Sequence, residues 1–384
     1  MAKQVKSRDI PISVERELWA RAAGRCQFDG HNEILYRSPV TQERVNQAQK
    51  AHIWSFSPDG PRGQGPHAVD QSKINDADNL LLMCAGCHKL IDNEDDGGRY
   101  TTRLLLSWKK EHEERVERVT SIAADRQSHV VCFGADIGDE ITNIDVSSCV
   151  EAMFQQRRYP ASNHPITIAL PAERKDEGGE YWITQERHLV DRFARLVSAI
   201  VEREESPRFS IFGVAPQPLL ILLGSLFTDK SFADVYQLHR QPLGWSWTQE
   251  RNKFDVSLSR PESVTGQPVL VISISASITH DRISRVLSED VSIWEIEISN
   301  PFNDALQSRE QLERFSEVAR QALAEISKNH GSKALSIFPA MPVACAVTLG
   351  LVRQPKADSP WIIFDQNNKN CGFFEALRIG DSSE

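Results

Sequence analysis

The sequence predicts an α/β protein in which a small zinc-containing domain is followed by a larger domain with a largely parallel sheet. Two observations support this prediction. In the C-terminal two-thirds, short β-type runs alternate with longer amphipathic stretches, as strands alternate with helices. In the N-terminal third, a Cys-x4-His and a Cys-x-x-Cys supply four residues of the types that bind zinc. The 384 residues are enough for two or three domains.

The N-terminal third starts with a predicted helix. Val14, Leu18 and Ala22 are spaced four residues apart, Ser13 stands where an N-cap is expected, and the helix ends at Gly24. Residues 54–79 are rich in Gly, Pro, Asp and Ser, so they are predicted to form a loop.

A second helix is predicted from about Thr102 to Val119, because apolar residues recur at helical spacing and the remaining face is charged. Residues 123–129 have no clear period, which is typical of a connection between domains. We therefore expect a first domain over residues 1–120, a linker over 121–134 and a second domain over 135–384.

The C-terminal two-thirds contain seven candidate strands and four candidate helices. The strands are residues 129–134, 166–170, 209–214, 269–274, 294–298, 335–338 and 361–364, and the helices are residues 186–203, 217–226, 309–327 and 342–351. Two such α/β units, roughly 140–260 and 260–384, would form a duplicated domain. No sequence repeat joins them, so the duplication is inferred from the order of the elements alone.

Composition narrows the function. Hydrophobic residues make up 40% and charged residues 25%, which excludes a disordered chain. No apolar run is long enough to span a bilayer and no secretion signal is evident, so we expect a soluble cytoplasmic protein with reduced cysteines. Residues 1–120 carry equal numbers of basic and acidic residues, so the net charge of −9 lies in the rest. DNA contacts are therefore expected in the N-terminal part, through clusters such as Lys109 and Lys110.

Four residues are candidate ligands of a structural zinc ion: Cys26, His31, Cys84 and Cys87. Together they provide the ligand set of a closed tetrahedral site. Buried thiols are the alternative, but that interpretation leaves two cysteines on a tight turn before a histidine unexplained. For the position of His31, Asp29 is the alternative ligand.

The order His52, Asn79, His88 around this cysteine pair resembles the HNH nuclease family, which has the ββα-metal fold. The resemblance covers about the first 120 residues through His52-Ile, Asn79-Leu-Leu-Leu and Cys84-x-x-Cys87-His88. It implies that His52 ends a strand, that Asn79 lies on or beside a second strand, and that His88 opens a helix. All three would then face one divalent cation, Mg²⁺ or Mn²⁺.

Phosphodiester hydrolysis explains these residue types. An imidazole titrates near neutral pH and suits the base that deprotonates water, and we assign this role to His52. A cation is needed to stabilise charge on the scissile phosphate, with His88 as its best ligand. Asn79 would orient His52 or hold the loop.

The family usually places a further metal ligand directly before the base, but this chain has Ala51 there. Asp92, one turn after His88, and Asp78 are candidate substitutes. The alternative for His52 is a satisfied core histidine. Arg62 and Arg99, in or next to glycine-rich stretches, either contact DNA phosphates or are solvated loop residues.

Several C-terminal segments resemble the SAVED domain, a relative of two fused CARF (Rossmann-like) units that binds cyclic oligonucleotides in bacterial anti-phage systems. The segments are residues 235–240 with Trp245 and Trp247, residues 336–342, and residues 350–356 before 361–365. The resemblance implies a nucleotide messenger, a cyclic di- or trinucleotide made by a partner cyclase.

General physical reasoning also supports a ligand pocket, because ligands collect where parallel strands end and helices begin. Phe338, Pro339 and Ala340 belong to such a turn, and residues 170–175 form another. Trp245 and Trp247 are candidate stacking faces for bases and Arg240 a partner for phosphate, unless the tryptophans are a core pair.

An HNH domain joined to a SAVED domain resembles the nuclease effectors of cyclic-oligonucleotide-based anti-phage signalling. The resemblance implies a metal-dependent endonuclease that cuts duplex DNA with little sequence preference and becomes active when the messenger binds. It also implies a homo-oligomer that grows larger on activation. Two alternatives remain: a modification-dependent restriction endonuclease, whose C-terminal domain reads altered bases, and a non-catalytic zinc-containing nucleotide sensor.

Overall fold

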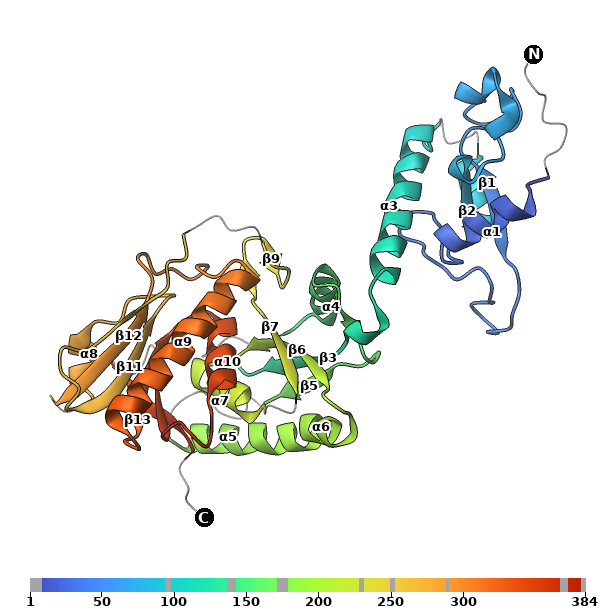
Figure 1. Cartoon of the computed structure of the whole chain (residues 1–384). Coiled ribbons are helices and arrows are strands. Elements are labelled where there is room, and N and C mark those ends of the chain that lie inside the picture. Colours follow the sequence, from blue (N-terminus) through green and yellow to red (C-terminus); the bar gives the residue numbers. More distant parts are fainter. Residues whose placement is uncertain are drawn as a thin grey trace. The chain divides into compact units, whose positions relative to one another are not determined.

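The computed structural model describes residues 9–93, 98–136, 143–170, 179–227, 231–248, 253–287, 290–366 and 372–380. The chain divides into two compact units, Met1–Ala123 and Ala124–Glu384 (Figure 1). In the described part of the chain, no helix has the length and apolar character needed to cross a membrane. The turn expected at 170–175 lies outside the described residues, apart from Leu170.

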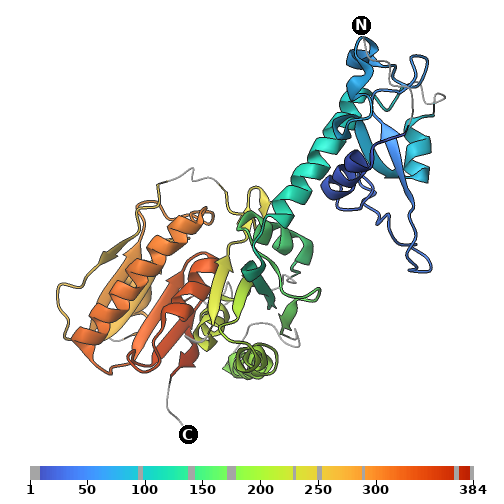
Figure 2. The same cartoon turned by 45° about the vertical axis from the view of Figure 1, so that its right-hand side comes forward.

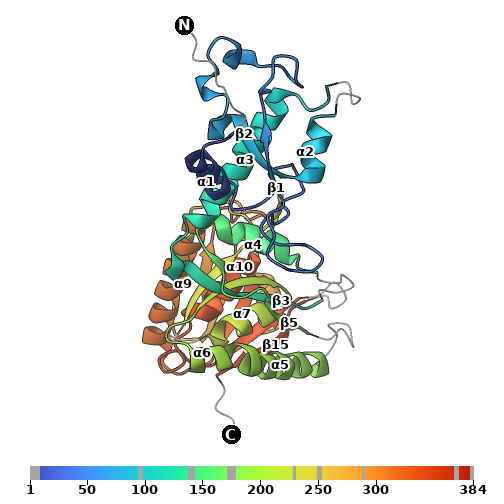
Figure 3. The same ribbon diagram turned by 90° about the vertical axis from the view of Figure 1, so that its right-hand side faces the viewer.

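The first unit is built on a two-stranded antiparallel sheet. Its main elements are α1 (Ile12–Arg21), β1 (Ala48–His52), β2 (Leu80–Cys84), α2 (Ala85–Ile91) and α3 (Thr102–Thr120). Short 3₁₀ turns, η1 (Gly65–Ala68), η2 (Gln71–Lys73) and η3 (Ala77–Asn79), occupy part of the predicted loop. In the β1–β2 ladder His52 is opposite Leu80, and α2 packs beside both strands (Figure 3).

The first helix differs from its prediction at both ends. Pro11, not Ser13, is the N-cap of α1, because the fixed φ of proline suits the residue that precedes the first helical turn. The helix ends at Arg21, and Gly24 follows in the turn with a φ of +64°, a conformation that glycine adopts without strain.

The second unit begins with a parallel sheet of strands β4-β3-β6-β7, with β5 also paired to β3. The strands are β3 (Gln127–Gly134), β4 (Tyr159–Pro160), β5 (Ile166–Ala169), β6 (Arg208–Val214) and β7 (Phe232–Tyr236). The helices are η5 (Ala124–Arg126), α4 (Val146–Gln155), α5 (Gly179–Phe193), the π-helical segment η6 (Ala194–Ser198), α6 (Ala199–Arg203) and α7 (Gln217–Leu226). β3 lies within the stretch expected to be a linker: buried Val131 and Phe133 make it a core strand.

A second sheet has the order β10-β12-β11-β13-β14-β15, parallel in its centre and antiparallel at both edges. Its strands are β10 (Ser257–Ser259), β11 (Gln267–Ser273), β12 (Val291–Glu297), β13 (Leu335–Ala340), β14 (Trp361–Asp365) and β15 (Phe374–Ile379). The other elements are the hairpin β8 (His239–Arg240) and β9 (Leu243–Gly244), and helices α8 (His280–Ser284), α9 (Arg309–His330) and α10 (Val343–Val352). α9 lies across the face of this sheet (Figure 2). The α/β class with two sheet units is confirmed.

The two halves of this unit meet where α7 crosses α10. Each helix follows a central strand, has a proline N-cap (Pro216 or Pro342), and carries a glycine eight residues later (Gly224 or Gly350). A Cβ on Gly224 would lie 2.0 Å from the Val347 carbonyl oxygen, so the backbones are in direct contact. The same proline-to-glycine spacing in both halves supports duplication, although two residues per half are too few to show as a sequence repeat.

Candidate functional site

The four candidate zinc ligands come together in the first unit. The ligand atoms of Cys26, His31, Cys84 and Cys87 all lie within 4.8 Å of one another. His31 Nδ1 is 3.5 Å from Cys87 Sγ and 3.8 Å from Cys84 Sγ. Tetrahedral zinc bonds of about 2.3 Å to sulfur and 2.0 Å to nitrogen place neighbouring ligand atoms about 3.6 Å apart. The cluster therefore fits a tetrahedral zinc ion, with His31 rather than Asp29 as the fourth member.

Local chain geometry brings the cysteines together. Cys84 ends β2 and is the N-cap of α2, where its Sγ accepts a hydrogen bond from the Cys87 backbone N–H at 3.4 Å. The Cys84 N–H in turn donates to Cys26 Sγ at 3.4 Å. Burial raises the pKa of the Cys26 thiol. Because zinc binds thiolates, metal binding at this cluster must release protons.

His52 is the last residue of β1, and it is half-buried, whereas the preceding Ala51 is fully buried. The His52 ring nitrogen Nε2 lies 2.9 Å from Oδ1 of Asn75, in the loop before β2. This hydrogen bond orients the ring and fixes which nitrogen carries the proton. Asn75 was missed from the sequence, because one polar residue in a polar loop has no distinguishing pattern.

Asn79 holds the loop after β1. Its Oδ1 accepts from the Trp54 N–H at 2.8 Å, while its Nδ2 donates to the carbonyls of Trp54 at 3.0 Å and Ile74 at 2.8 Å. The side chain is 4% exposed, so these bonds satisfy polar groups that water cannot reach. In the structure, orientation of His52 thus falls to Asn75, and Asn79 fixes the backbone that follows it.

His88 and Asp92 form a pair on one face of α2. Nε2 of His88 lies 3.2 Å from Oδ2 of Asp92. Adjacent ligands of an octahedral Mg²⁺ ion with bonds of about 2.1 Å are about 3.0 Å apart, so the two atoms fit one edge of such a shell. Burial opposes ionisation of Asp92, but hydrogen bonds from His88 and Arg62 lower the pKa of its carboxyl group below the ordinary value. A carboxylate is the form that binds a cation.

The sequence suggested that Arg62 is either a DNA contact or a solvated loop residue. The structure shows neither. The Arg62 side chain is 9% exposed and its NH2 group lies 2.7 Å from Oδ1 of Asp92. The guanidinium also donates to backbone carbonyls of residues 52, 53 and 91, so burial is offset by hydrogen bonds.

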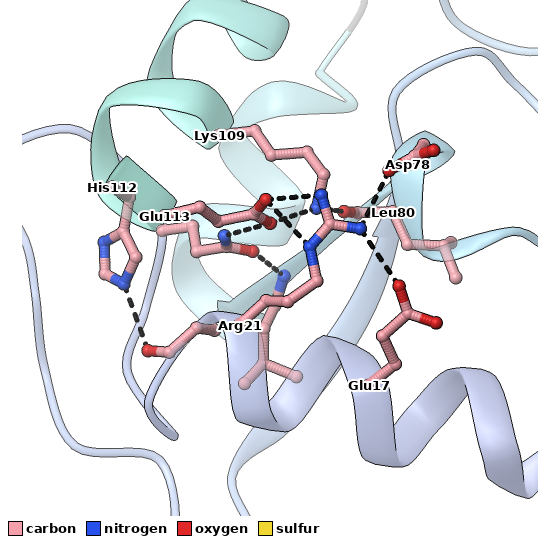
Figure 4. A network of polar contacts seen from close by, with 10 residues as sticks. Glu17, Arg21, Asp78, Leu80, Lys109, His112 and Glu113 are labelled. Atoms are coloured by element: carbon pink, nitrogen blue, oxygen red, sulfur yellow. Dashed lines mark hydrogen bonds and ion pairs between the residues drawn. The ribbon is translucent and has the colours of Figure 1, made fainter. Parts of the chain in front are cut away.

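Among the described residues, no contact joins Asp78 to His88 or Asp92. Instead the carboxylate of Asp78 pairs with Arg21 at 2.8 Å, and 86% of the Asp78 side chain is exposed (Figure 4). The hydrogen bond from Arg21 lowers the pKa of Asp78. The tentative assignment of Asp78 to the metal is therefore not supported by its surroundings.

Lys109 is also different from its prediction. The side chain is buried, pairs with Glu113, and donates to the Leu80 carbonyl at 2.9 Å (Figure 4). A lysine held in this way cannot contact DNA phosphates. Lys110, whose side chain is 74% exposed, remains accessible.

The second unit contains a pocket of about 810 Å³. It is lined by the end of α7, by β7, by the start of α9, and by the end of α10 with the segment after it. Four of the lining residues are cations: Arg309, Arg320, Arg353 and Lys356.

Of the residues expected to bind ligand, only Trp247 lines this pocket. Trp245 is buried elsewhere, edge-on against Phe212, and Arg240 is exposed on the β8–β9 hairpin. The two tryptophans do not share a strand face, because residues 245–248 are not a strand.

The expected strand-to-helix turn at Phe338, Pro339 and Ala340 is also different. These residues are the end of β13, and the turn is formed by Met341 and Pro342. Phe338 is fully buried and stacks on Phe364 at 4.4 Å between ring centroids. It is a core residue, so it cannot offer a face to a ligand.

Charge in the pocket is arranged around Asp234. Its carboxylate lies within 4.0 Å of three guanidinium groups, from Arg158, Arg208 and Arg309. Arg158 and Arg208 do not line the pocket, whereas Glu313, which pairs with Arg309 at 3.1 Å, does. The lining holds four cations and two carboxylates, Asp234 and Glu313, so it carries excess positive charge. Thr348 is 7% exposed, lines the pocket, and its hydroxyl has no hydrogen-bond partner in the structure as described. The pocket suits a polar, anionic ligand.

Comparison with known families identifies both parts of the chain. Residues 26–95 match the HNH endonuclease family, and residues 189–379 match the family described as "SMODS-associated and fused to various effectors sensor domain", SAVED. Both resemblances are confirmed: the chain joins an HNH endonuclease domain to a SAVED sensor domain. No curated protein gives a significant match.

Solved structures with detectable similarity include Cap4 SAVED/CARF-domain containing receptors. The Acinetobacter baumannii receptor with the cyclic trinucleotide 2'3'3'-cAAA is 14% identical, with a TM-score of 0.43 over 84% of this chain and 67% of that chain. The Moraxella osloensis receptor is 11% identical, with a TM-score of 0.37 over 72% and 60%. The present chain thus spans about two thirds of these receptors or less.

Proposed function

We propose that this protein is an effector endonuclease that hydrolyses duplex DNA with a divalent cation and is activated when a cyclic oligonucleotide binds its SAVED domain. The observation that carries the nuclease part is the arrangement of one ββα element. A half-buried histidine ends β1, and a histidine–aspartate pair lies on α2, which begins at the Cys/His cluster.

The chain's own residues have distinct roles in this proposal. His52 takes the proton from the attacking water, and Asn75 keeps its ring oriented. His88 and Asp92 hold Mg²⁺ or Mn²⁺, which when bound supplies positive charge to the scissile phosphate. The Cys/His cluster holds structural zinc and fixes the start of α2. These groups need no base-reading contact, in accord with cleavage of little sequence preference.

The cationic pocket is the proposed messenger site. A cyclic di- or trinucleotide carries one phosphate per nucleotide, and the four cations that line the pocket, Arg309, Arg320, Arg353 and Lys356, match such a ring of negative charge. Trp247 lines the pocket and is the residue that we propose to stack on a base of the messenger, as the sequence suggested. The messenger would come from a partner cyclase, and the protein would act in the cytoplasm.

Activation requires assembly in this proposal. A single metal site cuts one strand, so a double-strand break needs two sites brought together. The messenger must therefore bind the assembled form more tightly than the inactive form, since only differential affinity shifts an equilibrium.

The decisive experiment incubates supercoiled plasmid and Mg²⁺ with the full chain and a panel of cyclic di- and trinucleotides. We expect one or a few nucleotides to convert plasmid to linear fragments and to raise the particle mass measured by light scattering. His52→Ala should abolish cleavage but keep the mass change. Full cleavage without any nucleotide would contradict the gating. Cleavage only of DNA with altered bases would favour a restriction enzyme, and messenger binding with no cleavage under any metal would favour a non-catalytic sensor.

A further inference from the structure

The side chain of Arg62 connects three separate segments of the nuclease unit. It comes from the Gly/Pro-rich loop between β1 and η1, where Arg62 has a φ of +68°. Non-glycine residues rarely adopt this left-handed conformation, so a compensating interaction is expected. That interaction comes from the buried guanidinium, which donates to four acceptors around it.

Two of these acceptors belong to the end of β1. The Nε atom of Arg62 donates to the carbonyl of Ile53 at 2.9 Å, and NH2 donates to the carbonyl of His52 at 3.0 Å. Arg62 therefore holds the backbone of the proposed base, whereas Asn75 contacts its ring.

The other two acceptors belong to the end of α2. NH1 donates to the carbonyl of Ile91, and NH2 lies 2.7 Å from Oδ1 of Asp92. The second oxygen of the same carboxylate, Oδ2, is the one that lies 3.2 Å from His88 Nε2. Because Arg62 occupies Oδ1, the carboxylate is held with Oδ2 turned toward His88.

We propose that Arg62 is a positioning residue of the nuclease site, which sets both the orientation of Asp92 toward the catalytic cation and the position of the His52 backbone relative to it. This inference rests on the proposed function of His52, His88 and Asp92. Residues that orient metal ligands through hydrogen bonds typically change metal affinity or activity 10- to 100-fold when replaced.

A lysine cannot replace this arginine. An ammonium group on a flexible stem has no planar fork with which to bond the carbonyls of His52 and Ile53 and the carboxylate of Asp92 together. Arg62→Lys keeps the charge and loses the geometry, so it separates a positioning role from a purely electrostatic one.

The test measures Mn²⁺ binding to the full chain by electron paramagnetic resonance, and in parallel the Mg²⁺ concentration that gives half-maximal plasmid cleavage. For Arg62→Lys we expect both to weaken by about 10- to 100-fold, with unchanged zinc content and unchanged messenger binding. Arg37→Lys is the matched control, since Arg37 is exposed and donates to Gln42 outside this contact set, and it should behave as wild type.

Combination with Asp92→Asn tests the route of the effect. If Arg62 acts through Asp92, the double variant should bind Mn²⁺ no more weakly than Asp92→Asn alone. Wild-type Mn²⁺ affinity in Arg62→Lys, or additive losses in the double variant, would overturn the inference. If Arg62→Lys loses zinc, Arg62→Gln replaces it, and its Mn²⁺ affinity alone and combined with Asp92→Asn is measured at saturating zinc. If the wild-type chain binds Mn²⁺ but cuts no DNA, and these variants bind Mn²⁺ more weakly, the proposed function is rejected and the positioning role of Arg62 stands.

Discussion

Oδ1 of Asn75 lies 2.9 Å from Nε2 of His52, although the two residues are 23 positions apart and in different elements. General bases on enzymes are usually held by a second group that fixes the ring and its proton. Here the amide of Asn75 holds the ring. An amide is neutral, so it adds no charge beside the imidazole.

The first prediction concerns this pair. His52→Ala should lower the cleavage rate by about 10²- to 10⁴-fold, the usual contribution of a positioned base. Asn75→Ala should lower it less, by about 10-fold, and should have no further effect once His52 is absent, because residues that act as a unit are not additive. Single-turnover cleavage of a labelled duplex measures all three variants.

Asn46→Ala is the control for Asn75→Ala, since Asn46 is exposed and its side chain accepts from the Ala48 N–H, away from the site. It should cut DNA at the wild-type rate. If Asn75→Ala slows cleavage equally in the presence and absence of His52, its role is structural and the pairing has no catalytic meaning.

The second prediction concerns zinc. Cys84→Ser should release about one zinc ion per chain and unfold the first unit, because structural zinc contributes folding free energy directly. Elemental analysis and limited proteolysis would show metal loss and cleavage within residues 1–123, while messenger binding persists.

Cys132→Ser provides the comparison, because Cys132 is a buried cysteine of the second unit outside the cluster. It should retain zinc in full. Well-folded wild-type protein free of zinc would refute the assignment of the cluster.

The third prediction concerns the pocket. Arg309→Ala should weaken messenger binding by about 10- to 100-fold, as expected for loss of one charge-assisted hydrogen bond to phosphate. It should also raise the messenger concentration needed for cleavage by the same factor. Calorimetric titration at two salt concentrations measures the affinity and its charge dependence.

Arg240→Ala separates this pocket from the site suggested by the sequence. Arg240 is an exposed arginine on the β8–β9 hairpin and does not line the pocket, so its loss should leave affinity unchanged. The reverse result, weak binding in Arg240→Ala and normal binding in Arg309→Ala, would move the ligand site to the hairpin.

The fourth prediction concerns the helix crossing. A Cβ at Gly224 would meet the Val347 carbonyl oxygen at 2.0 Å, so Gly224→Ala must push the backbones apart. We expect a loss of about 1–3 kcal/mol in the free energy of unfolding, the usual cost of overpacking. Gly179→Ala, in α5, meets no atom within 4 Å and should be neutral or slightly stabilising. Equal urea midpoints for the two variants would show that the crossing relaxes freely.

The extent of prediction from sequence differs between the two units. Cys84 and Cys87 are on one turn, and His88 and Asp92 are on one helical face, so spacing alone places them together. Local spacing and the family motif were therefore enough for the Cys/His cluster and for the order of the proposed nuclease residues.

The messenger pocket could not be predicted in this way. Asp234 and Arg309 are 75 positions apart, and they meet only because β7 of one sheet lies beside the start of α9 from the other half. Trp245 failed for a related reason: the sequence shows that a tryptophan is present, but only packing against Phe212 shows that its faces are covered. Lys109 is a residue type that often contacts DNA, but in the structure its buried side chain forms an ion pair with Glu113.

The contact between Gly224 and Gly350 also has a consequence for descent. A Cβ on Gly224 would meet the backbone oxygen of Val347 at 2.0 Å, and a Cβ on Gly350 would meet that of Ile221 at 2.0 Å. Neither position can therefore gain a side chain while the crossing is kept. Most surface positions of a duplicated ancestor are free to diverge until no resemblance between the halves remains. This pair is not. The helix with a proline N-cap and a glycine eight residues later, α7 in one half and α10 in the other, should therefore outlast the rest of the shared ancestry. It should mark distant relatives whose overall sequences no longer align.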